Sequence, residues 1–221
     1  TVEFSSLSAT SIGPATFNNL TFSGTTTYTL GTTTSQTITV NNNLTVGTGS
    51  ATIVNVNTND PTLDVNGSVT IATSGTLQAS NSGSFTIGGG FSNSGTFTHN
   101  SGLVQYDGAS GSVAPVSYYD ITLGGTGTYT LSNSAWNIAH NMSITSGATV
   151  TKGSGTITFN GTTAATYTDS TATKQNIGVV VINKTDSGAP STNNKLTLAS
   201  SMTADTLTID GTAGSPDTFD M

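Results

Sequence analysis

The feature that most constrains this chain is a short motif in which two apolar residues flank one polar residue and an Asn–Gly or Asp–Gly pair follows. It occurs four times, at Leu63–Gly67, Val104–Gly108, Ile157–Gly161 and Leu207–Gly211. Alternation with a period of two places one side of a strand in a core and the other side in solvent. Gly preceded by Asn or Asp is typical of tight turns, because Gly and Asn permit the positive φ angles that sharp corners need. The motif therefore predicts many short strands separated by sharp corners.

These turns divide the chain into modules of similar but not fixed length. Subtracting the residue numbers of the closing glycines gives spacings of 41, 53 and 50 residues. The turn positions that close the modules are Asn66, Gly67, Asp107, Gly108, Asn160, Gly161, Asp210 and Gly211. We predict one continuous unit over 1–221, with modules at about 1–67, 68–108, 109–161 and 162–211 and a tail at 212–221.

A longer internal match links two parts of the chain. Phe17, Leu20, Phe22, Tyr28 and Leu30 each recur as an apolar residue 101 positions later. The next pair of expected strands continues the match after a turn that is three residues shorter. Internal similarity of this kind is typical of repeat architectures, in which each unit packs against its neighbour.

We predict an all-β fold, a single-stranded parallel β-helix (β-solenoid) of irregular coils. Many expected strands have only two inward residues, which suits a narrow core, and the length variation falls in the turns. A single Glu, four Lys and few clusters of helix-forming residues leave little from which to build helices. The alternative is a set of antiparallel β-sandwich repeats, since Asn–Gly and Asp–Gly are also strong hairpin signals.

The charge pattern narrows the classes of partner. The chain has a net charge of −7, no Arg and no Cys, and its only cations are Lys152, Lys174, Lys184 and Lys195. Without a basic patch, we expect no nucleic-acid binding. No apolar run approaches the roughly 20 residues that span a bilayer, so we expect no membrane insertion. Without Cys, disulfides and thiolate metal ligands are impossible, and the two His residues lack partners at ligand spacing. We therefore expect no metal and no cofactor.

The sequence also lacks a catalytic motif, and we predict that the chain is not an enzyme. Its carboxylates are scattered rather than paired as glycoside hydrolysis requires. Asp107 and Asp210 occupy a turn position that Asn66 and Asn160 hold in other modules, which indicates turn chemistry. A Gly-x-Ser-x-Gly nucleophile elbow is absent.

Aromatic residues supply one candidate binding site. Tyr118, Tyr119 and Trp136 lie close together in sequence, and exposed rings of this kind can stack on sugars. They are therefore the candidate carbohydrate-binding residues. In the internal match, however, Tyr118 corresponds to Phe17 and Trp136 to Ile38, two expected core positions. That correspondence favours core packing, since aromatic side chains strongly favour burial.

Thr–x–Thr triplets raise a further alternative, an ice-binding protein with a Thr-rich face. Examples begin at Thr37, Thr96, Thr156 and Thr206. An ice-binding face needs such triplets on consecutive coils at constant spacing, whereas these are irregularly spaced. Outward Thr on half-buried strands is the more economical interpretation.

Several phrases resemble a known class of repeats. YYDITLGGTGTYTL, SGTITFNGT, SGTFTHNSGLVQYDG and MTADTLTIDGTAGSPDTFD are similar to repeats of very large bacterial surface proteins, in the style of filamentous-haemagglutinin and autotransporter-passenger β-helices. The resemblance extends from about Phe17 onward and includes no catalytic motif. It implies an extracellular or cell-surface stalk, filament segment or adhesive module. Its expected partners are neighbouring repeats, copies of itself or surface glycans.

Overall fold

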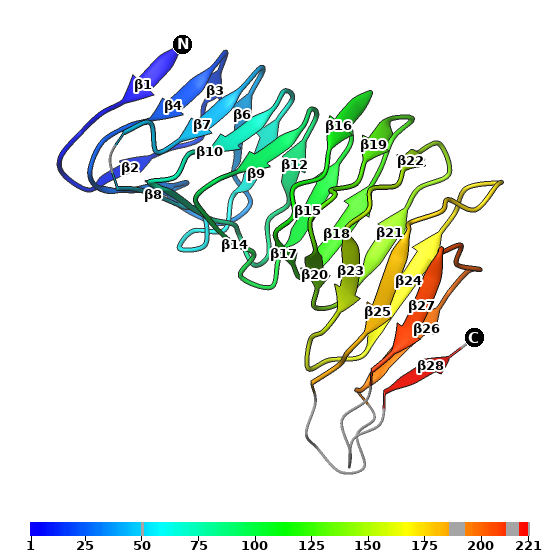
Figure 1. Ribbon diagram of the computed structural model, residues 1–221. Helices are drawn as coiled ribbons and strands as arrows, with labels where there is room; N and C mark the ends of the chain where they lie inside the picture. The colour runs from blue at the N-terminus through cyan, green and yellow to red at the C-terminus, as the bar shows by residue number, and fades with distance from the viewer. Residues whose placement is uncertain (50, 186–192, 211–216, 221) are drawn as a thin grey trace.

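The chain coils into a parallel β-solenoid with three faces (Figure 1). A computed structural model describes all residues except 50, 186–192, 211–216 and 221. The described residues form 28 strands and no helix, and every pairing between these strands is parallel. The predicted β-solenoid is thereby confirmed, and the antiparallel sandwich is wrong. With no helix among these residues, none is present that could cross a membrane.

Each of the first eight turns contributes one strand to each face, and the last two described turns contribute strands to two faces only. Face 1 consists of β1 (Val2–Phe4), β4 (Leu20–Phe22), β7 (Leu44–Val46), β10 (Val69–Ile71), β13 (Phe91–Asn93), β16 (Ser110–Ser112), β19 (Thr128–Thr130) and β22 (Thr149–Thr151). Face 2 consists of β2 (Thr10–Ile12), β5 (Thr27–Leu30), β8 (Thr52–Asn55), β11 (Gly75–Gln78), β14 (Thr96–Thr98), β17 (Ser117–Tyr118), β20 (Trp136–Ile138), β23 (Thr156–Phe159), β25 (Val179–Ile182) and β27 (Thr206–Ile209).

Face 3 is one uninterrupted sheet of ten strands, whereas faces 1 and 2 each divide into two sheets after the fifth turn. Its strands are β3 (Thr16–Phe17), β6 (Thr37–Val40), β9 (Thr62–Val65), β12 (Phe85–Ile87), β15 (Leu103–Tyr106), β18 (Asp120–Leu123), β21 (Met142–Ile144), β24 (Ala165–Asp169), β26 (Lys195–Leu198) and β28 (Thr218–Asp220). The number of residues per turn along this sheet varies from 17, between Gln105 and Thr122, to 31, between Thr166 and Thr197. The extra residues of the longer turns lie in the corners between strands, so the strand registers stay continuous.

Apolar rows run along the inside of the solenoid because each strand alternates inward and outward side chains. One row on face 3 consists of Ile38, Leu63, Phe85, Val104, Ile121, Met142 and Tyr167, each no more than 1% exposed. Such a core is only a few side chains wide. Most backbone hydrogen bonds run between turns, so each turn is stabilised by the turns on either side of it.

The glycines that close the modules have a different physical role from the expected one. We expected them to supply positive φ angles at corners, but Gly67, Gly108 and Gly161 do not have positive φ. Instead, a Cβ at Gly108 would lie 1.6 Å from the carbonyl oxygen of Gly88, and one at Gly161 would lie 2.0 Å from that of Ala139. Glycine is required because stacked turns approach each other closely. Gly211 lies outside the described residues.

The internal match rotates around the solenoid. Phe17 of β3 corresponds to Tyr118 of β17, and Tyr28 of β5 corresponds to Tyr129 of β19, each fourteen strands later. With three strands per turn, fourteen strands equal four turns and two thirds. A residue on face 3 in the first copy therefore corresponds to a residue on face 2 in the second copy, and a residue on face 2 corresponds to one on face 1. The structural unit is one third of a turn, and the modules inferred from closing glycines span two turns or more.

Candidate functional surfaces

The aromatic residues predicted to bind sugars lie mostly in the core. Tyr118 is fully buried and Trp136 is 2% exposed, and their rings pack edge to face with centroids 5.6 Å apart. The Tyr118 hydroxyl lies 3.0 Å from that of Tyr106 and donates to the carbonyl of Ala114 at 2.9 Å. Burial raises the pKa of Tyr118 and Tyr106, so both hydroxyls remain protonated. A sugar could not reach either Tyr118 or Trp136 in this arrangement.

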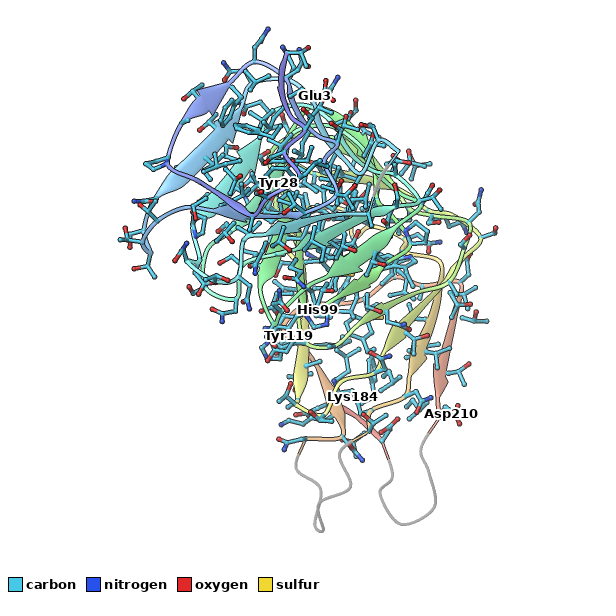
Figure 2. All side chains as sticks on the ribbon, turned by 90° about the vertical axis from the view of Figure 1, so that its left-hand side faces the viewer. Glu3, Tyr28, His99, Tyr119, Lys184 and Asp210 are labelled. Carbon is cyan, nitrogen blue, oxygen red and sulfur yellow. The ribbon has the colours of Figure 1, made fainter. Side chains whose placement is uncertain are left out.

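Tyr119 faces outward and belongs to a column of rings on the corner between faces 2 and 3. His99 lies 5.9 Å from Tyr119 between ring centroids, and Tyr119 stacks on His140 at 4.8 Å. Figure 2 shows His99 and Tyr119 side by side at the edge of the molecule. Sequence reasoning missed this column, because its residues are 20 and 21 positions apart and the turn length is known only from the structure.

The carboxylate of Asp120 binds His140, one of the three rings in the column. The side chain of Asp120 lies 2.8 Å from Nδ1 of His140 and accepts the backbone N–H of Asn141 at 2.8 Å. His99 Nδ1 accepts the backbone N–H of Ser101. Burial lowers the pKa of His99, and the nearby charge of Asp120 partly opposes that shift. The two Asp120 contacts and the two ring contacts connect adjacent turns at this corner.

Face 1 has a regular array of hydroxyl groups on turns six to eight. Its members are Ser110, Ser112, Thr128, Thr130, Thr149 and Thr151, and all six are exposed. Ser110 pairs with Thr128 and Thr128 with Thr149, so the residues form two straight rows. Here the strand phase is outward–inward–outward, the reverse of β4 and β7 on the same face. The reversal doubles the number of outward positions on each strand.

The four Thr–x–Thr triplets noted in the sequence do not form such an array. Those that begin at Thr37 and Thr96 lie on faces 3 and 2. The two that begin at Thr156 and Thr206 are both on face 2, but Val179 and Val181 lie between them in the register. The hydroxyl array on face 1 comes from other triplets, which only the turn register reveals.

Polar groups replace apolar ones inside the last turns. Asp169 is fully buried and lies in register with Ile144, at the end of an apolar row. Its carboxylate accepts the backbone N–H groups of Thr171 at 2.9 Å and Gln175 at 2.7 Å. These bonds fix the loop that follows β24, where face 1 no longer has a strand among the described residues.

Lys184 is the second buried charge in this region, with 1% of its surface exposed (Figure 2). Its amine donates to the carbonyl of Ala139 at 2.9 Å, while its backbone N–H donates to Asp217 at 2.9 Å. Burial lowers the pKa of the Lys184 amine to about 8, and the charge of Asp217 partly opposes this shift. Burial likewise raises the pKa of Asp217.

The remaining turn residues each come directly after a strand. Asn66 follows β9 and Asp107 follows β15 on face 3, whereas Asn160 and Asp210 follow β23 and β27 on face 2. Burial raises the pKa of Asp107, and the charge of Asp64 adds to that shift. The described residues include no group of three or more His, Asp or Glu that could hold a metal ion.

Among the hollows on the described part of the surface are two that are lined by no charged or His side chain. One lies at the end of the last turns and is lined by Leu198, Ala199, Ser200, Ser201, Met202, Ala204, Leu207 and Phe219. The other lies against the strands β13, β16 and β19, and its lining includes Ser112, Pro115 and Asn133. Neither hollow offers a general acid, a general base or an ionised nucleophile.

Comparison with known proteins yields no relative. No protein-family model matches the chain, and no curated protein or solved structure matches it.

Proposed function

We propose that the chain is a structural and adhesive module, a stiff segment of an extracellular or cell-surface stalk or filament. The observation that supports this most directly is the ten-strand parallel sheet of face 3, which connects all described turns. Bending such a rod sharply would break rows of backbone hydrogen bonds between turns. The resemblance of its repeats to those of filamentous haemagglutinins and autotransporter passengers supports the same proposal.

The surface chemistry also suits a spacer better than an enzyme. Its outward rows consist largely of Thr, Ser and Asn, and only 7% of all residues are charged. Neither hollow contains a group that catalyses hydrolysis or elimination. We therefore expect no release of product when the chain is incubated with acidic polysaccharides.

Surface labelling tests the proposed location. Antibodies against the purified chain should label intact cells of the organism that produces it, without permeabilisation. Labelling that requires permeabilisation would contradict an extracellular role. Electron microscopy of a fusion with a globular domain at each end should show the two domains held at a constant separation.

A second candidate function, binding of ordered or ice-like water, is favoured by the hydroxyl array on face 1. The rows are spaced by the strand separation of about 4.8 Å, and hydroxyls on one strand are about 6.7 Å apart. Such a regular grid can hold water at repeated positions. Thermal hysteresis that is lost in Thr149→Tyr but kept in Thr70→Tyr would support it, because Thr70 is an exposed residue in the earlier part of face 1. The absence of hysteresis from the unmodified chain would remove this candidate.

A further inference from the structure

The two ends of the solenoid expose residues that belong to inward rows. At the first turn, Val2 pairs with the buried Leu20 yet is 41% exposed. At the last turn, Leu207 pairs with Val180 and Ile209 with Ile182; the two partners are fully buried, whereas Leu207 and Ile209 are 39% and 48% exposed. The first and last described turns therefore both expose apolar side chains.

The two end surfaces differ in shape. At the first turn, Leu7 projects from the corner between β1 and β2 with 81% of its surface exposed. At the last turns, an open hollow of about 570 Å³ has a mostly apolar lining that includes Leu198, Met202, Leu207 and Phe219. One end thus carries a protruding apolar side chain and the other an apolar depression.

Leu7, here called the knob, and the hollow lie at the same angular position around the solenoid axis. Leu7 lies between face 1 and face 2 of its turn. The hollow is formed mainly by residues 198–204, which follow β26 of face 3 and precede β27 of face 2, in the place that face 1 occupies in earlier turns. If a first turn stacked on a last turn as consecutive turns do, β2 would align with β27 and β3 with β28. Leu7 would then lie over the hollow.

We propose that these ends bind each other in a head-to-tail contact, so that a second copy of this chain is the partner. The contact would extend the turn-to-turn stacking that already builds the molecule, with Leu7 in the hollow and Phe17 against Phe219. The ends lie at opposite extremities of the solenoid (Figure 1). Because the two surfaces are different, the contact does not close on itself and each added copy leaves one free end of each kind. This proposal rests on the structural role proposed above and specifies its assembly.

Two variants that each block one end test the contact. Leu7→Asp removes the knob and keeps the hollow, and Leu207→Asp charges the hollow and keeps the knob. We expect concentration-dependent oligomers of the unmodified chain in sedimentation velocity and monomers of each variant alone. An equimolar mixture of the variants should form a dimer of twice the 22.2 kDa mass and nothing larger. A monomeric unmodified chain, variants that oligomerise like it, or a mixture without dimer would overturn the proposal.

Cross-linking gives a second test that does not depend on a charged variant folding. The chain has no Cys, so Leu7→Cys and Leu207→Cys copies can form only the disulfide between the two introduced sites or symmetric pairs. Mild oxidation of the mixture should favour the mixed dimer, which joins one copy of each variant, at least tenfold over a control mixture with Thr70→Cys in place of Leu7→Cys. Equal yields would contradict head-to-tail binding. A stiff chain that stays monomeric would contradict this contact alone and leave the proposed rod intact.

Discussion

The first five turns and the turns after them fill the interior of the solenoid in different ways. From β1 to β15 each turn has three strands, and the inward rows are apolar. From β16 onward face 1 reverses its strand phase, then loses its strands, and buried Asp169 and Lys184 appear where apolar side chains would otherwise lie. Face 3 alone continues through both regions. The comparison teaches that a solenoid can lose one of its faces, provided that one sheet remains continuous and that the replacing loops satisfy their polar groups.

The largest expected effect is at the junction between the regions. Gly108→Ala would place a Cβ 1.6 Å from the carbonyl oxygen of Gly88, so the turns must separate. We expect a loss of about 4 kcal/mol in the free energy of unfolding by urea. Gly13→Ala is the matched control, because its nearest atom would be 4.0 Å from the new Cβ. Similar losses in the two variants would mean that the turns are not as tightly stacked as described.

A pair of Leu→Ala substitutions compares the two regions directly. Leu44 is fully buried on β7, whereas Leu207 on β27 is 39% exposed. We expect Leu44→Ala to cost about 3 kcal/mol and Leu207→Ala less than about 1 kcal/mol, because only the first leaves an enclosed cavity. Monomer stability must be measured at low protein concentration. Equal costs would remove the contrast between a filled body and an open end.

Asp169→Asn tests whether buried polar bonds hold the loop that replaces face 1. The amide would turn an N–H group toward the N–H of Thr171 or Gln175, which the carboxylate now accepts. A loss of about 2 kcal/mol is expected for an unsatisfied buried donor. Asp64→Asn, on the outward side of β9, should change stability by less than about 0.5 kcal/mol. Fluorescence of Trp136, the single Trp, reports on this region.

The smallest effect on stability at pH 7 is expected at Lys184. Burial lowers its pKa from 10.5 to about 8. Between these values Lys184 has released a proton in the folded chain that it still binds in the unfolded chain, so the contribution of Lys184 to stability should rise as the pH increases from about 8 to about 10.5. Lys184→Met should remove this rise and leave stability at pH 7 unchanged or slightly higher. An identical pH profile in the variant would show that another group is responsible.

Sequence reasoning predicted the fold class because two-residue alternation and close turn signals are local properties. The internal match also placed Tyr118 and Trp136 in the core by their correspondence with Phe17 and Ile38, and both are buried. The ring column of His99, Tyr119 and His140 could not be predicted. Whether two outward residues become neighbours depends on the exact length of the turn between them, which varies from 17 to 31 residues along face 3. The hydroxyl array on face 1 was missed for the same reason.

The glycine corners show a different limit. The recurring Asn–Gly and Asp–Gly motif predicted where these glycines occur. It did not predict why glycine is required there. Positive φ is a property of one residue, whereas the approach of Gly108 to Gly88 depends on the stacking of two turns that are 20 residues apart. Asp169, by contrast, continues the two-residue alternation of Ala165 and Tyr167 on β24, so its inward position has a local signal. Local sequence carries no signal for the contact between Gly108 and Gly88.

The most direct test of a continuous rod is a distance along face 3. Thr39 and Thr168 lie in the same outward row, separated by the intermediate positions Asp64, Thr86, Gln105, Thr122 and Ser143. Six strand spacings of about 4.8 Å predict a separation of about 29 Å. In a chain without Cys, Thr39→Cys and Thr168→Cys carry the only spin labels, and pulsed electron paramagnetic resonance measures the distance between them. The account predicts one narrow distribution near this value, and a broad distribution or a clearly different distance would contradict it.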